Sequence, residues 1–124
     1  MGKITYFYDT YAFLEIIKGN PKYYDYASNH GIMTAKLNIM ELYYTLLRTE
    51  GLKRAEHFFA SFDKFVVKIN DSLIKEAMVF KLKNKDKKLS YVDCIGYIFS
   101  RRLNIKFLTG DNGFKELENV EFVK

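Results

Sequence analysis

Four acidic residues of this chain lie in segments that are otherwise apolar. They are Asp9, Glu41, Asp93 and Asp111, in the segments ITYFYDTYAFL, LNIMELYYTLL, LSYVDCIGYIF and KFLTGDNGF. Most of the remaining Asp and Glu residues lie among lysines, turn residues or other polar groups, where water solvates them. A carboxylate in apolar surroundings needs a hydrogen-bond donor, a cation or a proton to offset its lost hydration. The four positions together therefore predict one acidic pocket that binds a metal ion.

The chemistry of such a pocket follows from its charge. At ~4 Å and an effective dielectric of ~20, each pair of like charges costs about 4 kcal/mol, so protons or cations must compensate, and at neutral pH we expect a divalent ion. Oxygen ligands alone favour Mg²⁺, with Mn²⁺ as its substitute, over Zn²⁺, which prefers His and Cys. The two histidines, His30 and His57, are not spaced for a site. A divalent ion that activates water and stabilises a leaving oxygen serves phosphodiester hydrolysis.

The elements that position these acids alternate between strands and helices. Short β-branched and aromatic segments predict strands over 4–8, 32–34, 65–69, 105–109 and 120–123. Apolar periodicity and capping residues predict helices over 9–19, 21–31, 38–51 and 52–62, and two more that begin near 70 and 90. Strands separated by helices indicate an α/β protein, here a three-layer α/β/α sandwich with a central, mostly parallel sheet of about five short strands.

The topology of such a sheet predicts that the four acids meet. Asp9 directly follows the first strand, and Asp111 follows the apolar part of the fourth. Glu41 is expected in the first turn of the helix after the second strand, and Asp93 in the first turn of the helix before the fourth. All four positions are at the carboxyl edge of the strands, where open α/β sheets bind ligands.

The order and spacing of these motifs resemble the PIN-domain family of metal-dependent nucleases, especially its small single-domain members, the VapC-type toxins of toxin–antitoxin pairs. The likeness covers nearly the whole chain. It rests on Asp9-Thr10 after the first strand, Glu41 within an apolar helix, and the segments LSYVD at 89–93 and FLTGD at 107–111, followed by Phe114. It implies one PIN-like domain over residues 1–124 that acts as an endoribonuclease.

The resemblance also implies roles for particular residues and partners. The catalytic and metal-binding residues would be Asp9, Glu41, Asp93 and Asp111, with Mg²⁺ or Mn²⁺ as the cofactor. The residues that orient these carboxylates or the bound waters would be Thr10, Ser90, Thr109 and Asn112. Phe114 and Lys115 stand where some relatives carry a further acid, so one or two metal ions remain possible. The expected partners are an RNA substrate, a cognate antitoxin and a second copy of the chain.

Local structure offers a different explanation for each acid. Asp9 suits the N-cap of a helix, and Asp111 suits turn chemistry. Asn38 with Glu41, and Ser90 with Asp93, have the spacing of capping boxes. An RNA-processing PIN nuclease outside a toxin system, or a non-catalytic RNA- or protein-binding module of the same fold, therefore remains an alternative. A receiver domain is disfavoured because Asp9 has no acidic neighbour, and an Asp-x-Asp phosphatase because position 11 is Tyr.

Composition bears on the partners. The net charge of +5 favours a polyanionic partner. The lysine run over 81–88 is either a solvated helix end or a phosphate-binding surface. The tyrosine-rich helical face of Tyr23, Tyr24, Tyr26, Tyr43 and Tyr44 is the expected homodimer interface, with core packing and base stacking as the alternatives. No apolar run approaches ~18 residues, so we expect no membrane span, and the single Cys fits a reducing, cytoplasmic location.

Overall fold

The computed structural model describes residues 3–124, and Met1 and Gly2, which the predicted domain includes, lie outside the described residues. Its five strands form one parallel sheet in the order β3-β2-β1-β4-β5. The strands are β1 (Thr5–Tyr8), β2 (Gly31–Ala35), β3 (Val66–Val67), β4 (Lys106–Thr109) and β5 (Val120–Phe122). Because β1 is central, its carboxyl end lies in the middle of the rim. The predicted α/β class is confirmed, and the sheet is parallel throughout.

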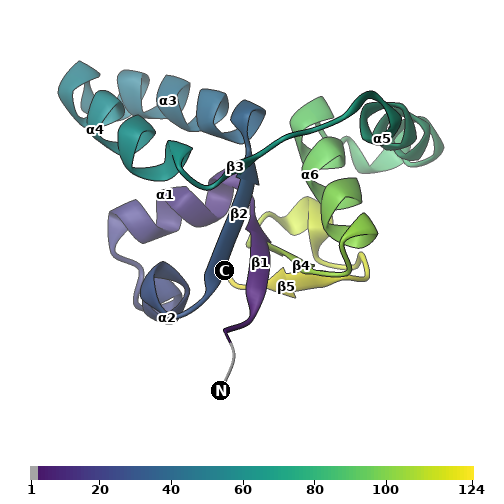
Figure 1. Ribbon diagram of the computed structural model, residues 1–124, viewed down its shortest axis with the longest axis horizontal. Helices are drawn as coiled ribbons and strands as arrows, with labels where there is room; N and C mark the ends of the chain where they lie inside the picture. The colour runs from purple at the N-terminus through teal and green to yellow at the C-terminus, as the bar shows by residue number, and fades with distance from the viewer. Residues whose placement is uncertain (1–2) are drawn as a thin grey trace.

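Helices cover both faces of the sheet (Figure 1). The α-helices are α1 (Thr10–Lys18), α2 (Tyr24–Ser28), α3 (Lys36–Glu50), α4 (Leu52–Asp63), α5 (Asp71–Lys83) and α6 (Tyr91–Arg102). Three single turns of 3₁₀-helix accompany them, η1 (Pro21–Tyr23), η2 (Lys85–Lys87) and η3 (Asn112–Phe114). Helices α1 to α4 contribute to one hydrophobic core and α5 and α6 to the other. In Figure 1 the pairs α3–α4 and α5–α6 form two arms beside the carboxyl ends of β1 and β2.

The central strand serves both cores because successive side chains of a strand point to opposite faces. Tyr6 and Tyr8 belong to the core beneath α1 to α4, whereas Phe7 belongs to the core beneath α5 and α6. Helix α6 packs tightly against this second face at Gly96. A Cβ atom at Gly96 would lie 2.7 Å from the Phe7 ring and 3.0 Å from the Phe107 ring. The absent side chain lets α6 lie against β1 and β4, and its amino end reaches the rim.

The prediction that Asn38 caps the third helix was wrong. Helix α3 begins at Lys36, directly after β2, and its N-cap Ala35 makes no side-chain capping bond. Asn38 lies inside the helix with 1% of its surface exposed, and its amide donates to Thr10 Oγ1. A tertiary contact to α1 therefore takes the place of the expected cap. Glu41 consequently lies in the second turn of α3, and the predicted Asn38–Glu41 capping box is absent.

The observed boundaries of the other strands and helices differ less from the predicted ones. The strand predicted over 65–69 is only Val66–Val67, an edge strand that pairs with β2 alone. The helix predicted over 21–31 is divided into η1 and α2 and ends at Ser28.

Among residues 3–124, no helix combines the length and the apolar content that crossing a membrane requires.

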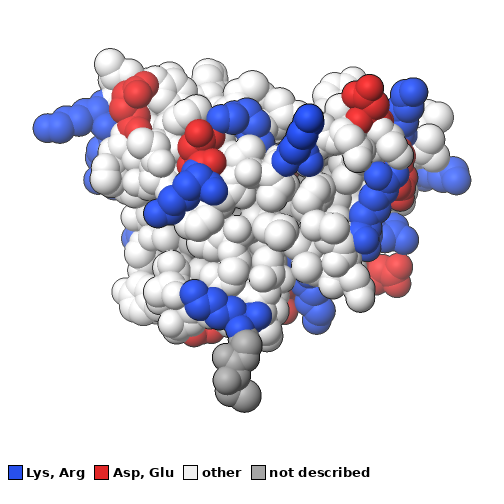
Figure 2. All heavy atoms as spheres, in the orientation of Figure 1, with Lys and Arg blue, Asp and Glu red and all other residues white. Residues whose placement is uncertain are grey.

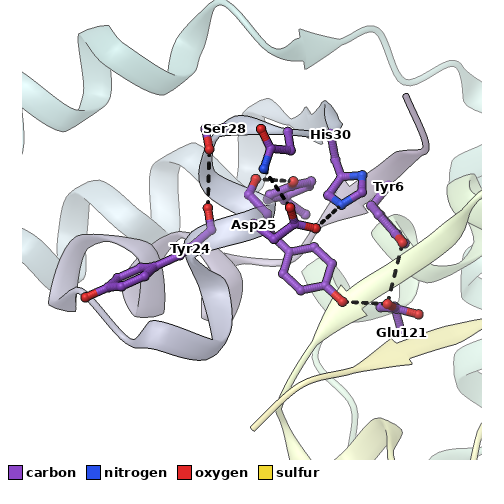
Figure 3. A network of polar contacts seen from close by, with 9 residues as sticks. Tyr6, Tyr24, Asp25, Ser28, His30 and Glu121 are labelled. Carbon is purple, nitrogen blue, oxygen red and sulfur yellow. Dashed lines mark hydrogen bonds and ion pairs between the residues drawn. The ribbon is translucent and has the colours of Figure 1, made fainter. Parts of the chain in front are cut away.

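The five tyrosines do not form one face. Tyr23 is fully buried and donates its hydroxyl to the Val123 carbonyl oxygen at 2.7 Å. Tyr26 donates to Glu121 at 2.5 Å in a polar network that also contains Tyr6 (Figure 3). In contrast, Tyr24 and Tyr44 are exposed. The predicted tyrosine-rich interface therefore does not exist as a single surface, because part of it lies in the core.

Candidate functional site

A cavity of about 450 Å³ opens at the carboxyl rim of the sheet, lined by residues from α1, α3, the start of α6 and the loop after β4. The four predicted acids, Asp9, Glu41, Asp93 and Asp111, all line it. We call this cavity the acidic pocket. Two of the predicted supporting residues, Thr10 and Ser90, also line it. Neither histidine does, and His30 instead contacts Asp25 in the polar network of Figure 3.

Asp9 is the most deeply buried of the four acids, with 3% of its surface exposed. As the N-cap of α1 it accepts a hydrogen bond from the Thr10 backbone N–H at Oδ1, at 2.9 Å. Its second oxygen, Oδ2, accepts from Thr109 Oγ1 at 2.8 Å. The same threonine oxygen accepts from the Asp111 backbone N–H at 3.1 Å. One hydroxyl therefore connects the carboxyl ends of β1 and β4.

Glu41 is held by the helix on the other side of Asp9. The Thr10 hydroxyl donates to Glu41 Oε1 at 2.8 Å and accepts from Asn38 Nδ2 at 3.2 Å. Asn38 is thus a supporting residue that the sequence reasoning assigned to a cap. Its spacing of three residues from Glu41, which puts both on one side of a helix, was the signal that pointed to this role.

Asp93 and Asp111 each use one carboxylate oxygen locally. Ser90 and Asp93 form the predicted capping box, with the Ser90 backbone N–H donating to Asp93 Oδ2 at 2.9 Å and the Asp93 backbone N–H donating to Ser90 Oγ at 3.0 Å. Asp111 Oδ1 accepts from the Gly113 backbone N–H at 3.0 Å. Within residues 3–124 the other carboxylate oxygen of each has no hydrogen-bond donor. Each of these two acids therefore uses one carboxylate oxygen for a local backbone hydrogen bond and leaves the other oxygen available to a ligand.

Asn112 behaves differently from the other predicted supporting residues. Its side-chain oxygen accepts a hydrogen bond from Lys124 Nζ at 3.0 Å. Asn112 is not among the residues that line the acidic pocket, although Asp111 beside it is. The backbone turn of η3 directs this side chain to the carboxyl end of the chain.

Electrostatics distinguish the acidic pocket from an ordinary group of helix caps. Burial, followed by the charge of Asp93, raises the pKa of Asp9 to about 8, against the hydrogen bonds from Thr109 and Thr10. Burial also raises the pKa values of Glu41 and Asp93. In the part of the chain that the structure describes, no Lys, Arg or His forms an ion pair with any of the four acids. None of the four acids is therefore neutralised by a direct ion pair among the described residues, although Arg48 also lines the acidic pocket and the charge of Lys81 lowers the pKa of Asp93.

The donor set fits a hard divalent cation such as Mg²⁺, which binds carboxylate oxygens and retains several waters. Its ligands are not yet gathered around one point. Among residues 3–124, no three His, Cys, Asp or Glu side chains are close enough together to hold a single ion as they stand. The fit therefore rests on the shared cavity, the free carboxylate oxygens and the absence of direct ion pairs to the four acids among residues 3–124.

The sequence matches a known family model, and the fold is similar to that of solved structures. The family model described as PIN domain matches residues 6–120. No curated protein matches the sequence. The solved structure of Mycobacterium tuberculosis VapC20, described as a sarcin-ricin loop cleaving toxin, has a TM-score of 0.79 and 20% identity, over 95% of this chain and 98% of that one.

Two further structures are similar. A toxin–antitoxin complex from Klebsiella pneumoniae has a TM-score of 0.70 and 14% identity, covering 93% of this chain and 94% of its own. VapBC2 from Rickettsia felis, bound to a DNA fragment from its promoter, has a TM-score of 0.70 and 17% identity, covering 97% and 98%. At these identities the likeness shows the fold, which is shared over almost the full length of each chain.

Proposed function

The chain belongs to the PIN-domain family, and from this membership and its acidic pocket we propose that it is a metal-dependent endoribonuclease, the toxin of a toxin–antitoxin pair. The observation that carries the proposal is that four carboxylates line one cavity and that none of them is ion-paired to a Lys, Arg or His within residues 3–124. Capping alone would not require them to share it. The chain's net charge of +5, in which the four acids of the pocket are already counted, suits a polyanionic substrate that brings its phosphate to a bound cation.

In this proposal Asp9, Glu41, Asp93 and Asp111 hold Mg²⁺, or Mn²⁺ in its place. The ion, when bound, supplies an activated water and stabilises the leaving oxygen of the cleaved phosphodiester. Thr109 and Thr10 fix the orientation of the carboxylates, because each donates its hydroxyl to one of them. Loss of supporting hydrogen bonds of this kind typically costs about 10- to 100-fold in metal affinity or activity.

The descriptions of the similar solved structures support a proposal for the substrate and the partners. VapC20 is described as cleaving the sarcin-ricin loop, and the other two structures are toxin–antitoxin assemblies. We propose that this chain likewise cleaves RNA in the cytoplasm, forms a homodimer, and is inhibited by a cognate antitoxin. A basic segment of that antitoxin would neutralise the acids of the pocket, none of which is ion-paired to a Lys, Arg or His among residues 3–124.

A cleavage assay tests the proposal. Wild-type protein should cut structured or single-stranded RNA with Mg²⁺ or Mn²⁺, and EDTA should stop the reaction. Asp9→Asn should fold normally and lose activity. Asp71→Asn is the matched control, because Asp71 is exposed at the first turn of α5 and lies outside the acidic pocket. Cleavage by Asp9→Asn at the wild-type rate under saturating metal would show that the assignment is wrong.

A further inference from the structure

Two exposed tyrosines flank the acidic pocket, one from each helical layer. Tyr44 on α3 is 65% exposed, and Tyr91, the first residue of α6, is 66% exposed. Tyr44 lines the pocket itself. Tyr91 does not line it, but its ring lies over Lys81, whose charge lowers the pKa of the pocket residue Asp93. Since α3 and α6 cover opposite faces of the sheet, the two tyrosines belong to helices on opposite sides of the carboxyl rim, as the ribbon in Figure 1 shows for α3 and α6.

A positively charged side chain lies over each of these two tyrosine rings. The Arg48 guanidinium lies 5.8 Å from the centroid of the Tyr44 ring, and Lys81 Nζ lies 4.9 Å from that of Tyr91. Arg48 also lines the acidic pocket. Lys81 is held in place because its ammonium donates to the Leu89 carbonyl oxygen. Among the described residues, neither cation forms an ion pair with a carboxylate, so both charges remain for a ligand.

An exposed aromatic ring beside an unpaired cation is the arrangement that binds single-stranded nucleic acids. The ring stacks on a base, and the cation contacts the phosphate backbone. The distribution of Lys and Arg on the face in Figure 2 favours such separate contacts, each made by one ring and one cation. Figure 2 shows Lys and Arg side chains spread over both helical arms of the face in view and not gathered into one continuous patch. A duplex bound through its backbone alone would be better served by such a patch.

We propose that Tyr44 with Arg48, and Tyr91 with Lys81, form two nucleotide subsites, one on each side of the acidic pocket. Each ring stacks on an unpaired base, and each cation contacts a backbone phosphate. The placement of the scissile phosphate between the subsites rests on the proposed nuclease function, whereas nucleotide binding at the two pairs does not. The preferred substrate is then RNA whose bases are unpaired on both sides of the cleavage point.

Binding to an inactive variant tests the subsites without turnover. The Asp9→Asn protein is titrated into a fluorescein-labelled single-stranded RNA of 12 nucleotides and mixed sequence, or its blunt duplex, and anisotropy is measured. In this background Tyr44→Leu or Tyr91→Leu should weaken single-strand binding about 5- to 100-fold, the usual range for losing one stacked base. The Tyr→Phe changes should keep it within about twofold, because the ring remains. Duplex binding should not change.

Tyr24→Leu is the matched control. Tyr24 is 62% exposed but does not line the acidic pocket, and Figure 3 shows its ring pointing away from the polar network around Asp25. It belongs to α2, which lies at the other end of the molecule from the two arms (Figure 1). Its replacement should leave RNA affinity as it is. Circular dichroism of every variant establishes that the fold is kept.

Salt dependence tests the cations separately. Arg48→Gln and Lys81→Gln should each reduce the slope of log affinity against log salt by about 0.7, the loss of one phosphate contact on a single strand. Lys22→Gln, at the start of η1, should not. The proposed subsites would be overturned if Tyr44→Leu and Tyr91→Leu fold and still bind single-stranded RNA as tightly as the Asp9→Asn parent does. They would also be overturned if these variants lose affinity for the duplex as much as for the single strand. Failure of wild-type protein to cut any RNA would instead overturn the nuclease proposal and leave the binding result standing.

Discussion

Replacing Asp9 by Asn should stabilise the metal-free protein at neutral and basic pH. Asp9 is 3% exposed, and burial, followed by the neighbouring charge of Asp93, raises its pKa to about 8. Asn keeps the side-chain oxygen that caps α1 at the Thr10 backbone N–H, and its amide can donate to the Thr109 hydroxyl. The substitution therefore removes the charge and retains the local hydrogen bonds.

The magnitude follows from proton linkage. An Asp in the unfolded chain titrates near about 3.9, so the native state holds a proton that the unfolded state has released. Because the folded pKa is the higher one, this contribution to the free energy of unfolding is complete below about pH 4 and is lost as the pH rises through about 8. Between pH 5 and pH 8 the loss amounts to about 3 to 4 kcal/mol. Water in the open pocket and cations in the buffer make this an upper value.

Urea denaturation in EDTA at pH 5, 6, 7 and 8 measures the effect. The free energy of unfolding of wild type should fall across this range relative to that of Asp9→Asn. The difference between the two curves cancels groups that do not interact with Asp9. It retains the coupling of Asp9 to Asp93 and Glu41, whose charges contribute to the raised pKa of Asp9. Asp71→Asn should follow wild type. Curves for wild type and Asp9→Asn that stay parallel from pH 5 to pH 8 would refute the reasoning about burial.

Three further expectations concern the metal, a supporting residue and the core. Mg²⁺ or Mn²⁺ at about 100 times its dissociation constant should stabilise wild type by about 2.7 kcal/mol at pH 8, and thermal melts of Asp9→Asn should show much less. Thr109→Val should lower the rate of RNA cleavage about 10- to 100-fold, whereas Thr109→Ser, which keeps the hydroxyl on Asp9, should retain most of it. Gly96→Ala should cost about 1 to 3 kcal/mol of unfolding free energy in urea melts, because its Cβ would lie 2.7 Å from the Phe7 ring.

The parts of the site that the sequence predicted are those set by local rules. Asp9 follows a strand of four residues without an intervening loop, so both its place at the rim and its capping role could be predicted. Ser90 and Asp93 are three residues apart at the start of an apolar periodic segment, and their capping box is present. In each case the determining contacts lie within a few residues.

The errors arose where a contact joins distant segments. Asn38 has the side chain of a cap, but its partner is Thr10, 28 positions away, and the helix begins two residues earlier. Tyr23 has an amphipathic side chain suited to a surface, but its hydroxyl finds the Val123 carbonyl oxygen, 100 positions away. Local propensity cannot rank such partners, because the favourable contact exists only after the sheet has formed.

The competition between helix capping and metal binding disappears once each carboxylate oxygen is considered separately. Helices that follow parallel strands begin at the carboxyl rim, and their amino ends favour negative side chains there. Asp93 satisfies its cap with Oδ2, and Asp111 satisfies its turn with Oδ1. The local bond fixes the rotamer of the side chain, and the remaining oxygen stays available at the acidic pocket. Capping thus supplies the rigidity that a metal ligand needs, and a bound cation would offset the cost of ionising the buried Asp9.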